Sequence, residues 1–185
     1  MFLAPQFELD DSVIQLVLPE PDHASDLFEL IDNNRKHLQP WLTWVSQIQT
    51  IDDEQDFIKI VQQQMYKQEI FLLIICIDGL PGGVIDLHEI EPNNHRAKVG
   101  YWLAPQFQKH GIMTHTLEKI IAYGFNQLHL HRLEIWIDSL NFRAQHVPQR
   151  LGFQREAKLR DCSFYNQKYH DLEIYSHLNY TDMSQ

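Results

Sequence analysis

The stretch at residues 99–117, VGYWLAPQFQKHGIMTHTL, most constrains how this chain can fold. An apolar run ends at a proline, a short polar segment follows, and beyond Gly111 the apolar residues return at near-helical spacing. The pattern predicts a strand, a turn and a helix that begins on the turn. Because the first N–H groups of a helix are unpaired and carry partial positive charge, such a turn suits a phosphate or pyrophosphate. Lys109 and a protonated His110 would add charge there.

The number of glycines limits which phosphate site this is. The dinucleotide-binding fingerprint needs three glycines, and this turn has one. A P-loop lysine is followed by Ser or Thr, whereas Lys109 is followed by His110. Both of these sites are therefore excluded. Taken alone, such a segment is more often an ordinary strand-to-helix junction than a phosphate site.

Length and composition favour one α/β domain over residues 1–185, because 185 residues with 44% hydrophobic content fill one core. The net charge of −10 argues against direct nucleic-acid binding and favours cationic partners. No apolar run is long enough to span a bilayer, and the N-terminus lacks the pattern of a secretion signal. We therefore expect a cytoplasmic protein without membrane contact.

Metal and disulfide chemistry have little support in the sequence. Cys76 and Cys162 form neither a disulfide framework nor a metal pair. His129 and His131 lie close together, but no HExxH or cysteine-rich arrangement accompanies them. We expect no metal site.

Periodicity and turn signals predict the remaining elements in order. Strands are expected at residues 13–18, 71–77, 84–90, 97–103 and 132–138, with a closing hairpin at 153–161 and 169–176. Helices are expected after residue 22, at 52–68, at 114–128 and after Asn141. The strand at 132–138 should run parallel to the one at 97–103, because a helix carries the chain back between them. Trp41 and Trp44 lie in an aromatic segment without clear period, which either fills the core or lines a pocket.

Residues 141–153, NFRAQHVPQRLGF, provide a second motif. By its residues alone it is a short helix that Asn141 caps and Gly152 ends. Together the two motifs resemble the signatures of the GNAT acetyltransferases, Gln/Arg-x-x-Gly-x-Gly/Ala followed by Asn-x-x-Ser/Ala-x-x-Val-x-x-x-Leu-Gly-Phe. Gly-Ile-Met-Thr, Pro-Trp-Leu-x-Trp and Tyr-His-Asp are similar to the RimJ/RimL branch of ribosomal-protein N-terminal acetyltransferases. The resemblance covers residues 13–178.

The resemblance implies a fold and a reaction. The fold is the acyl-CoA N-acyltransferase fold of class α/β (α+β), with a mixed, mostly antiparallel seven-stranded sheet that splays between its strands 4 and 5 and about four flanking helices. The reaction is transfer of the acetyl group of acetyl-CoA (coenzyme A) to an amine, foremost the N-terminal α-amine of a ribosomal protein. The chain would act as a monomer or homodimer.

The resemblance also implies the positions of the binding residues. The pantetheine arm would lie along Tyr101, Trp102 and Leu103 and reach Asn141. Arg143 would contact a phosphate or the adenine. Trp41 and Trp44 would border the acceptor. The pyrophosphate would lie on Gln108, Lys109, His110, Gly111, Ile112, Met113 and Thr114.

The reaction needs a neutral amine. Neutralising an α-amine of pKa near 8 at pH 7 costs about 1.4 kcal/mol, whereas a lysine near 10.4 costs roughly 4.6. Glu156, by its family position, is the first candidate base, followed by His88 and Glu89. Strand alternation allows His88 and Glu89 to share a face only if the strand bulges. Glu91 and Glu134 are weaker candidates.

Two departures from the family pattern leave alternatives open. Pro148 stands where many members have a tyrosine acid, and Ala144 stands where some have a serine. The proton donor for the thiol is therefore unassigned. A small-molecule amine or an antibiotic remains an alternative acceptor, and a coenzyme A-binding sensor or interaction module remains an alternative to an enzyme.

Overall fold

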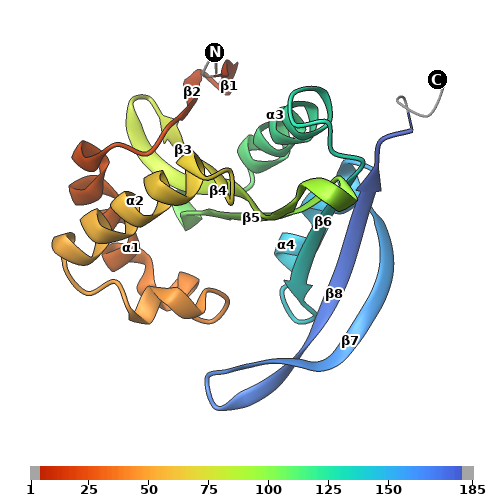
Figure 1. Ribbon diagram of the computed structural model, residues 1–185. Coiled ribbons are helices and arrows are strands. Elements are labelled where there is room, and N and C mark those ends of the chain that lie inside the picture. The colour runs from red at the N-terminus through yellow and green to blue at the C-terminus, as the bar shows by residue number, and fades with distance from the viewer. Residues whose placement is uncertain (1–4, 181–185) are drawn as a thin grey trace.

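The computed structural model describes residues 5–180. Within them one eight-stranded sheet has the order β1-β2-β3-β4-β5-β6-β8-β7 (Figure 1). Every neighbouring pair is antiparallel except β5 and β6, which are parallel as the sequence predicts. The strands are β1 (Gln6–Leu9), β2 (Ser12–Val17), β3 (Phe71–Ile77), β4 (Leu80–Glu91), β5 (Arg96–Leu103), β6 (Arg132–Asp138), β7 (Gln154–Tyr165) and β8 (Lys168–Leu178).

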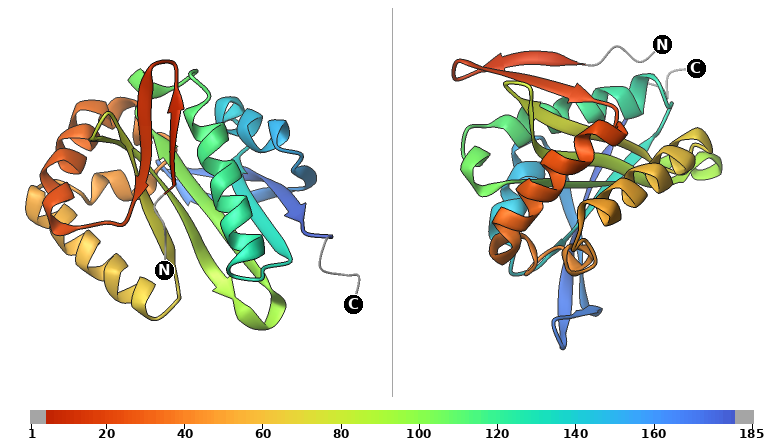
Figure 2. Two further views of the ribbon diagram at one scale, coloured as in Figure 1. Left: turned by 90° about the horizontal axis from the view of Figure 1, so that it is seen from above. Right: turned by 90° about the vertical axis from the view of Figure 1, so that its left-hand side faces the viewer.

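Four α-helices in the described residues cover the two faces of this sheet. Helices α1 (Ala24–Leu38) and α2 (Ile51–Tyr66) pack on one face, where Leu27 and Ile58 meet Ile74 of β3. Helices α3 (Ile112–Asn126) and α4 (Phe142–Arg150) pack on the other, where Leu117 joins the larger core. Figure 2 shows α1 and α2 together, and the β7–β8 hairpin extending away from the body. Among residues 5–180 no helix is long and apolar enough to cross a membrane.

The sheet has eight strands rather than the predicted seven. The additional strand, β1, pairs with β2 and is connected to it by a turn at Asp10 and Asp11, both of which have positive φ. It has four residues and alternates between exposed and half-buried positions, so it carries too little apolar pattern to be recognised in the sequence. The predicted strands 4 and 5 are therefore β5 and β6.

Strand β4 is longer than predicted because the turn before it is shorter. The connection from β3 is only Asp78 and Gly79, and β4 already begins at Leu80. Gly83 lies inside the strand because a Cβ there would lie 2.3 Å from the carbonyl oxygen of Trp102 on β5. The glycine reflects a close approach between strands rather than a turn.

The sheet divides between β5 and β6. Only three residue pairs join these strands, Arg96 with Arg132, Ala97 with Leu133, and Lys98 with Glu134. Beyond the third pair the two strands diverge, as Figure 1 shows. We call this point of divergence the fork. Within the described structure, the residues of β5 after Lys98 have no neighbouring strand on the β6 side.

Candidate functional site

The turn after β5 leads directly into α3. Lys109 and Gly111 both have positive φ, 74° and 80°. Gly111 is the N-cap of α3, and no side chain caps this helix end in the described structure. Its first turn contains no acidic residue. Left-handed residues interleaved with ordinary ones, followed by an uncapped helix N-terminus, direct backbone N–H groups to one point, which fits the predicted pyrophosphate site.

Gln108 fixes this turn to the elements on both sides. Its Nε2 donates to the carbonyl oxygen of Leu103 over 2.7 Å, at the end of β5. Its Oε1 accepts a hydrogen bond of 2.7 Å from the Arg143 guanidinium on α4. The structure therefore brings Gln108 and Arg143 together across the gap between β5 and β6 beyond the fork, which we call the opening.

The N-terminus of α4 lies beside the same opening. Asn141 caps this helix, as predicted, because its Oδ1 accepts from the Ala144 N–H over 3.2 Å. The Tyr101 hydroxyl on β5 donates to the carbonyl oxygen of Ala144 over 2.9 Å. Burial raises the pKa of Tyr101, so the hydroxyl remains protonated and keeps this bond.

The residues of β5 beyond the fork alternate between the two faces of the sheet. Tyr101 and Leu103 pack with the core on the α3 side. Trp102 points to the opposite face, where its ring centroid lies 6.0 Å from that of Trp44. Trp44 packs against the small core of the α1–α2 connection, whereas Trp41 is 38% exposed. Trp44 is thus close to the opening and Trp41 is at the surface.

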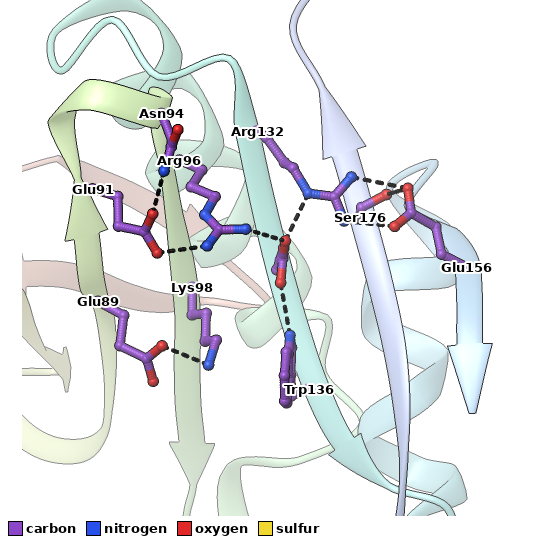
Figure 3. A network of polar contacts seen from close by, with 10 residues as sticks. Glu89, Glu91, Asn94, Arg96, Lys98, Arg132, Trp136, Glu156 and Ser176 are labelled. Atoms are coloured by element: carbon purple, nitrogen blue, oxygen red, sulfur yellow. Dashed lines mark hydrogen bonds and ion pairs between the residues drawn. The ribbon is translucent and has the colours of Figure 1, made fainter. Parts of the chain in front are cut away.

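Polar side chains form a network on this second face at the fork (Figure 3). Lys98 Nζ lies 2.6 Å from Glu89 Oε2 and 3.9 Å from the centroid of the Trp136 ring. The Trp136 indole donates to Glu134 Oε2 over 2.8 Å. Arg132 donates to Glu134 Oε1 over 2.7 Å, which extends the network to the next strands.

Glu156 is at the far end of this network. The two terminal nitrogens of Arg132 donate to its two oxygens over 2.9 and 2.5 Å, and the Ser176 hydroxyl donates to Oε1 over 2.5 Å. The Arg132 and Ser176 hydrogen bonds lower the pKa of Glu156 to about 2. A carboxylate with both oxygens engaged and so low a pKa is a weak proton acceptor.

His88 and Glu89 lie together because β4 bulges. Glu89 has a φ of 47°, and the β4–β5 register shifts between His88 and Glu91. Lys98 lies opposite His88 in this register and pairs with Glu89. A bulge was the condition under which strand alternation would allow His88 and Glu89 to share a face, and β4 has this bulge.

Asp86, which is not among the residues predicted for the site, contacts His88. His88 Nδ1 lies 2.6 Å from Asp86 Oδ1. Their spacing of two residues on a predicted strand was the available signal, because alternate residues share a face. Asp86 lies opposite Gly100, which is two residues beyond Lys98, the last residue of β5 that pairs with β6.

A second pair of this kind lies at the end of β6. His170 Nδ1 is 2.6 Å from Asp138 Oδ2, and the Tyr165 hydroxyl donates to the same oxygen. The Nε2 atom of His170 is buried and, among residues 5–180, has no hydrogen-bond partner. Among residues 5–180 no group of three or more metal-binding side chains is found.

Comparisons with known proteins agree with this geometry. A family model described as "Acetyltransferase (GNAT) domain" matches residues 14–154. The putative ribosomal N-acetyltransferase YdaF of Bacillus subtilis is 36% identical over 167 residues, 88% of this chain and 90% of that protein. The ribosomal-protein-serine acetyltransferase of Escherichia coli is 30% identical over 160 residues, 85% and 88% of the two chains. The spermidine N(1)-acetyltransferase of E. coli is 25% identical over 139 residues, 75% and 72%.

Solved structures give the same result. A crystal structure of a probable acetyltransferase is 32% identical with a TM-score of 0.87, covering 95% of this chain and 97% of that one. The microcin C7 self-immunity acetyltransferase MccE, solved with acetyl-CoA and AMP, is 28% identical with a TM-score of 0.86, covering 90% and 92%.

Proposed function

The chain belongs to the GNAT acetyltransferase family, and on that premise we propose that it acetylates the N-terminal α-amine of a protein. As a member of this family the chain is an N-acetyltransferase that uses acetyl-CoA. What we propose is the acceptor. The observation that carries it is similarity to two proteins named as ribosomal-protein acetyltransferases, over 85% or more of this chain in both cases.

We further propose how acetyl-CoA is held, because two features of the structure fit it. The uncapped N-terminus of α3 and the 108–114 turn suit the pyrophosphate, with Lys109 and His110 beside it. The unpaired side of β5 from Tyr101 to Leu103 leaves backbone groups to bond the pantetheine amides. Arg143 and Asn141 border the entrance from α4. When bound, acetyl-CoA supplies an activated acetyl thioester.

The acceptor would approach from the face that carries α1 and α2. On this face Trp44 and Trp102 lie beside the opening, and Trp41 is exposed at the surface. We assign Trp41 and Trp44 to the acceptor site on this basis. An N-terminal α-amine suits a mild base, because neutralising it at pH 7 costs only about 1.4 kcal/mol.

Among the three candidate bases, the contacts favour His88. Glu156 is held by Arg132 and Ser176, and Glu89 is paired with Lys98. His88 uses only Nδ1 in its contact with Asp86, so Nε2 remains available. Its side chain is 38% exposed, which lets an amine reach the ring.

We also propose that the chain is a single acetyltransferase domain. One continuous sheet includes strands from β1 near the N-terminus to β8 near the C-terminus. The larger core, which includes α3, packs on one face of this sheet, and the core formed with α1 and α2 packs on the other.

The acceptor is tested by release of free thiol from acetyl-CoA. We expect peptides with a free N-terminus to stimulate release, and mass spectrometry to find the acetyl group on the α-amine. The same peptides with a blocked N-terminus serve as the control. The peptide proposal fails if spermidine or an aminoglycoside is turned over at least ~10 times faster than every peptide, a difference of about 1.4 kcal/mol in transition-state binding.

A polyamine is the second candidate acceptor. The 25% identity to spermidine N(1)-acetyltransferase and the net charge of −10 favour it. Binding of coenzyme A without any amine-stimulated thiol release would instead favour a sensor.

A further inference from the structure

We propose that Asp86 and Gly100 act together as a positioning device for His88, which then accepts the proton of the acceptor amine at Nε2. This inference rests on the proposed function, because it names the base of the same site. Asp86 and Gly100 act through His88 and are positioning residues.

His88, Asp86 and Gly100 lie next to one another at the fork. In the β4–β5 register His88 is opposite Lys98, and Asp86 is opposite Gly100. Lys98 forms the last residue pair between β5 and β6. His88 is therefore level with the fork, and Asp86 is beside the first residue of the opening on the same face. This is the deepest part of the gap that the acyl arm would enter.

Gly100 leaves space that the Asp86 carboxylate occupies. A Cβ on Gly100 would lie 2.7 Å from Asp86 Oδ2 and 3.1 Å from Asp86 Oδ1. A real Cβ would force the carboxylate to move, because both distances are well inside normal contact. Gly100 is not among the glycines with positive φ, so the backbone conformation does not require it. The absence of a side chain at Gly100 is what allows Asp86 to lie against β5 and reach His88.

The contact with Asp86 fixes the tautomer of the His88 ring. An ionised Asp86 can only accept, so the contact of 2.6 Å places the ring proton of His88 on Nδ1. The lone pair is then on Nε2, and among residues 5–180 no hydrogen bond or ion pair to this atom is found. Asp86 also stabilises the imidazolium that forms when Nε2 takes a proton.

The proton transfer balances within the named groups. One N–H bond of the acceptor ammonium breaks, the proton passes to His88 Nε2, and the electron pair stays on the amine nitrogen. That pair would then form a C–N bond to the thioester carbonyl carbon, the C–S bond would break, and coenzyme A would leave as a thiolate. The second proton that the nitrogen loses would pass through water to this thiolate, and the imidazolium would return its own proton to water.

Asp86 is the carboxylate that contacts His88, whereas the neighbouring carboxylates have other partners. Glu89 is paired with Lys98, and Glu134 accepts from Arg132 and Trp136. The other aspartate–histidine pair, Asp138 with His170, does not compete for the amine because His170 Nε2 is buried. His88 is the histidine of the two that an incoming amine can reach.

The device is tested with His88→Gln, Asp86→Asn and Gly100→Ala. We expect His88→Gln to lower kcat by about 100-fold, and the other two by at least ~10-fold, with the Kd for coenzyme A unchanged. Two variants serve as controls. His37→Gln changes an exposed histidine on α1, and Gly124→Ala places a Cβ at an ordinary 3.5 Å from its neighbours in α3. Both should keep the wild-type kcat.

Nitrogen-15 NMR of the histidine rings provides a readout independent of turnover. We expect the Nδ1–H tautomer at His88 in the wild type and a shift towards Nε2–H in both Asp86→Asn and Gly100→Ala. If both variants keep the wild-type tautomer and the wild-type kcat, the proposed role of Asp86 and Gly100 is wrong. If Gly100→Ala does not fold, the result for Asp86→Asn alone tests the proposal. If the wild type transfers no acetyl group, the proposed function fails, while the tautomer still tests the geometry.

Discussion

At the scale of single residues, two glutamates show opposite effects of their surroundings. Arg132 and Ser176 lower the pKa of Glu156 to about 2. Burial raises the pKa of Glu54 on α2 to about 7, and one of its oxygens is buried without a hydrogen-bond partner in the described part of the chain. The first carboxylate is held in its charged form and the second is pushed towards its neutral form.

Glu54→Gln should stabilise the protein at alkaline pH. An acid with a raised pKa in the folded state favours folding less as pH rises from about 4.5 to about 7, and the full penalty remains above pH 7. A shift of this size corresponds to at most about 3 kcal/mol. We expect urea unfolding to give Glu54→Gln an advantage of about 1–3 kcal/mol at pH 8 and little at pH 4.5. Asp56→Asn, at an exposed site on the same helix, should show no such pH dependence.

Glu156→Gln should affect stability more than catalysis. Because the ion pair with Arg132 is partly exposed, we expect a loss of about 1 kcal/mol in unfolding free energy at pH 7. The pKa is lowered, so this contribution is complete above about pH 4.5 and disappears as pH falls towards 2. Thiol release should fall less than about tenfold. A loss of about a hundredfold or more with unchanged stability would instead make Glu156 the base.

The sequence identified His88 as a candidate but not the contact that activates it. Strand alternation put Asp86 and His88 on one face, yet many strand residues share a face without touching. The decisive fact is the close approach of Gly100 on β5, and this depends on how two strands far apart in the sequence are registered. The ion pair of Glu156 with Arg132 depends equally on tertiary structure, since it joins β7 to β6.

At the scale of elements, the helices followed closely from local signals. Thr50 caps α2 and forms a capping box with Asp53, as the sequence at residues 50–54 indicates. Strands were less well predicted where their residues looked like turns. Gly82 and Gly83 belong to β4, and β1 is too short to carry a pattern.

Gly111→Ala should weaken coenzyme A binding. Its φ of 80° is unfavourable for alanine, so relief of strain would redirect the N–H groups that begin α3. Gly152→Ala is a matched control, because Gly152 has a φ of 77° and comparable open space but lies after α4. We expect both to lose about 1 kcal/mol of stability. Calorimetry should find a weaker Kd for coenzyme A in Gly111→Ala alone, and equal affinities would remove the turn from the binding site.

At the scale of the whole molecule, two halves of a sheet meet at the fork. Three residue pairs join β5 to β6, and beyond them Gln108 with Arg143 and Tyr101 with Ala144 connect the two sides. The resemblance carried by the two signatures implied this splay, and the three residue pairs between β5 and β6 confirm it. The identity of the acceptor could not be predicted from the sequence. It depends on how Trp41 and Trp44 are placed, and the segment that carries them has no helical or strand periodicity. The cytoplasmic location and the oligomeric state stay predictions.

Coenzyme A should stabilise the molecule and protect the opening. Ligand at 100 times its Kd adds about 2.7 kcal/mol to the unfolding free energy. Hydrogen exchange should slow at residues 99–103 and in the 108–114 turn. ADP, which has the diphosphate but no pantetheine arm, should protect the turn only. Protection confined to the β7–β8 hairpin would contradict the proposed binding mode.

The unpaired edge of β5 has a consequence for how this architecture can diverge. Recognition through main-chain amides is the same for almost any side chain, so mutations along this strand alter packing without altering what the edge can bond. Related proteins can therefore differ at most of their residues and still bind acetyl-CoA as the thioester donor. Proteins with only about a third of their residues in common with this chain superimpose on it over nearly their full length, as such a tolerance would permit.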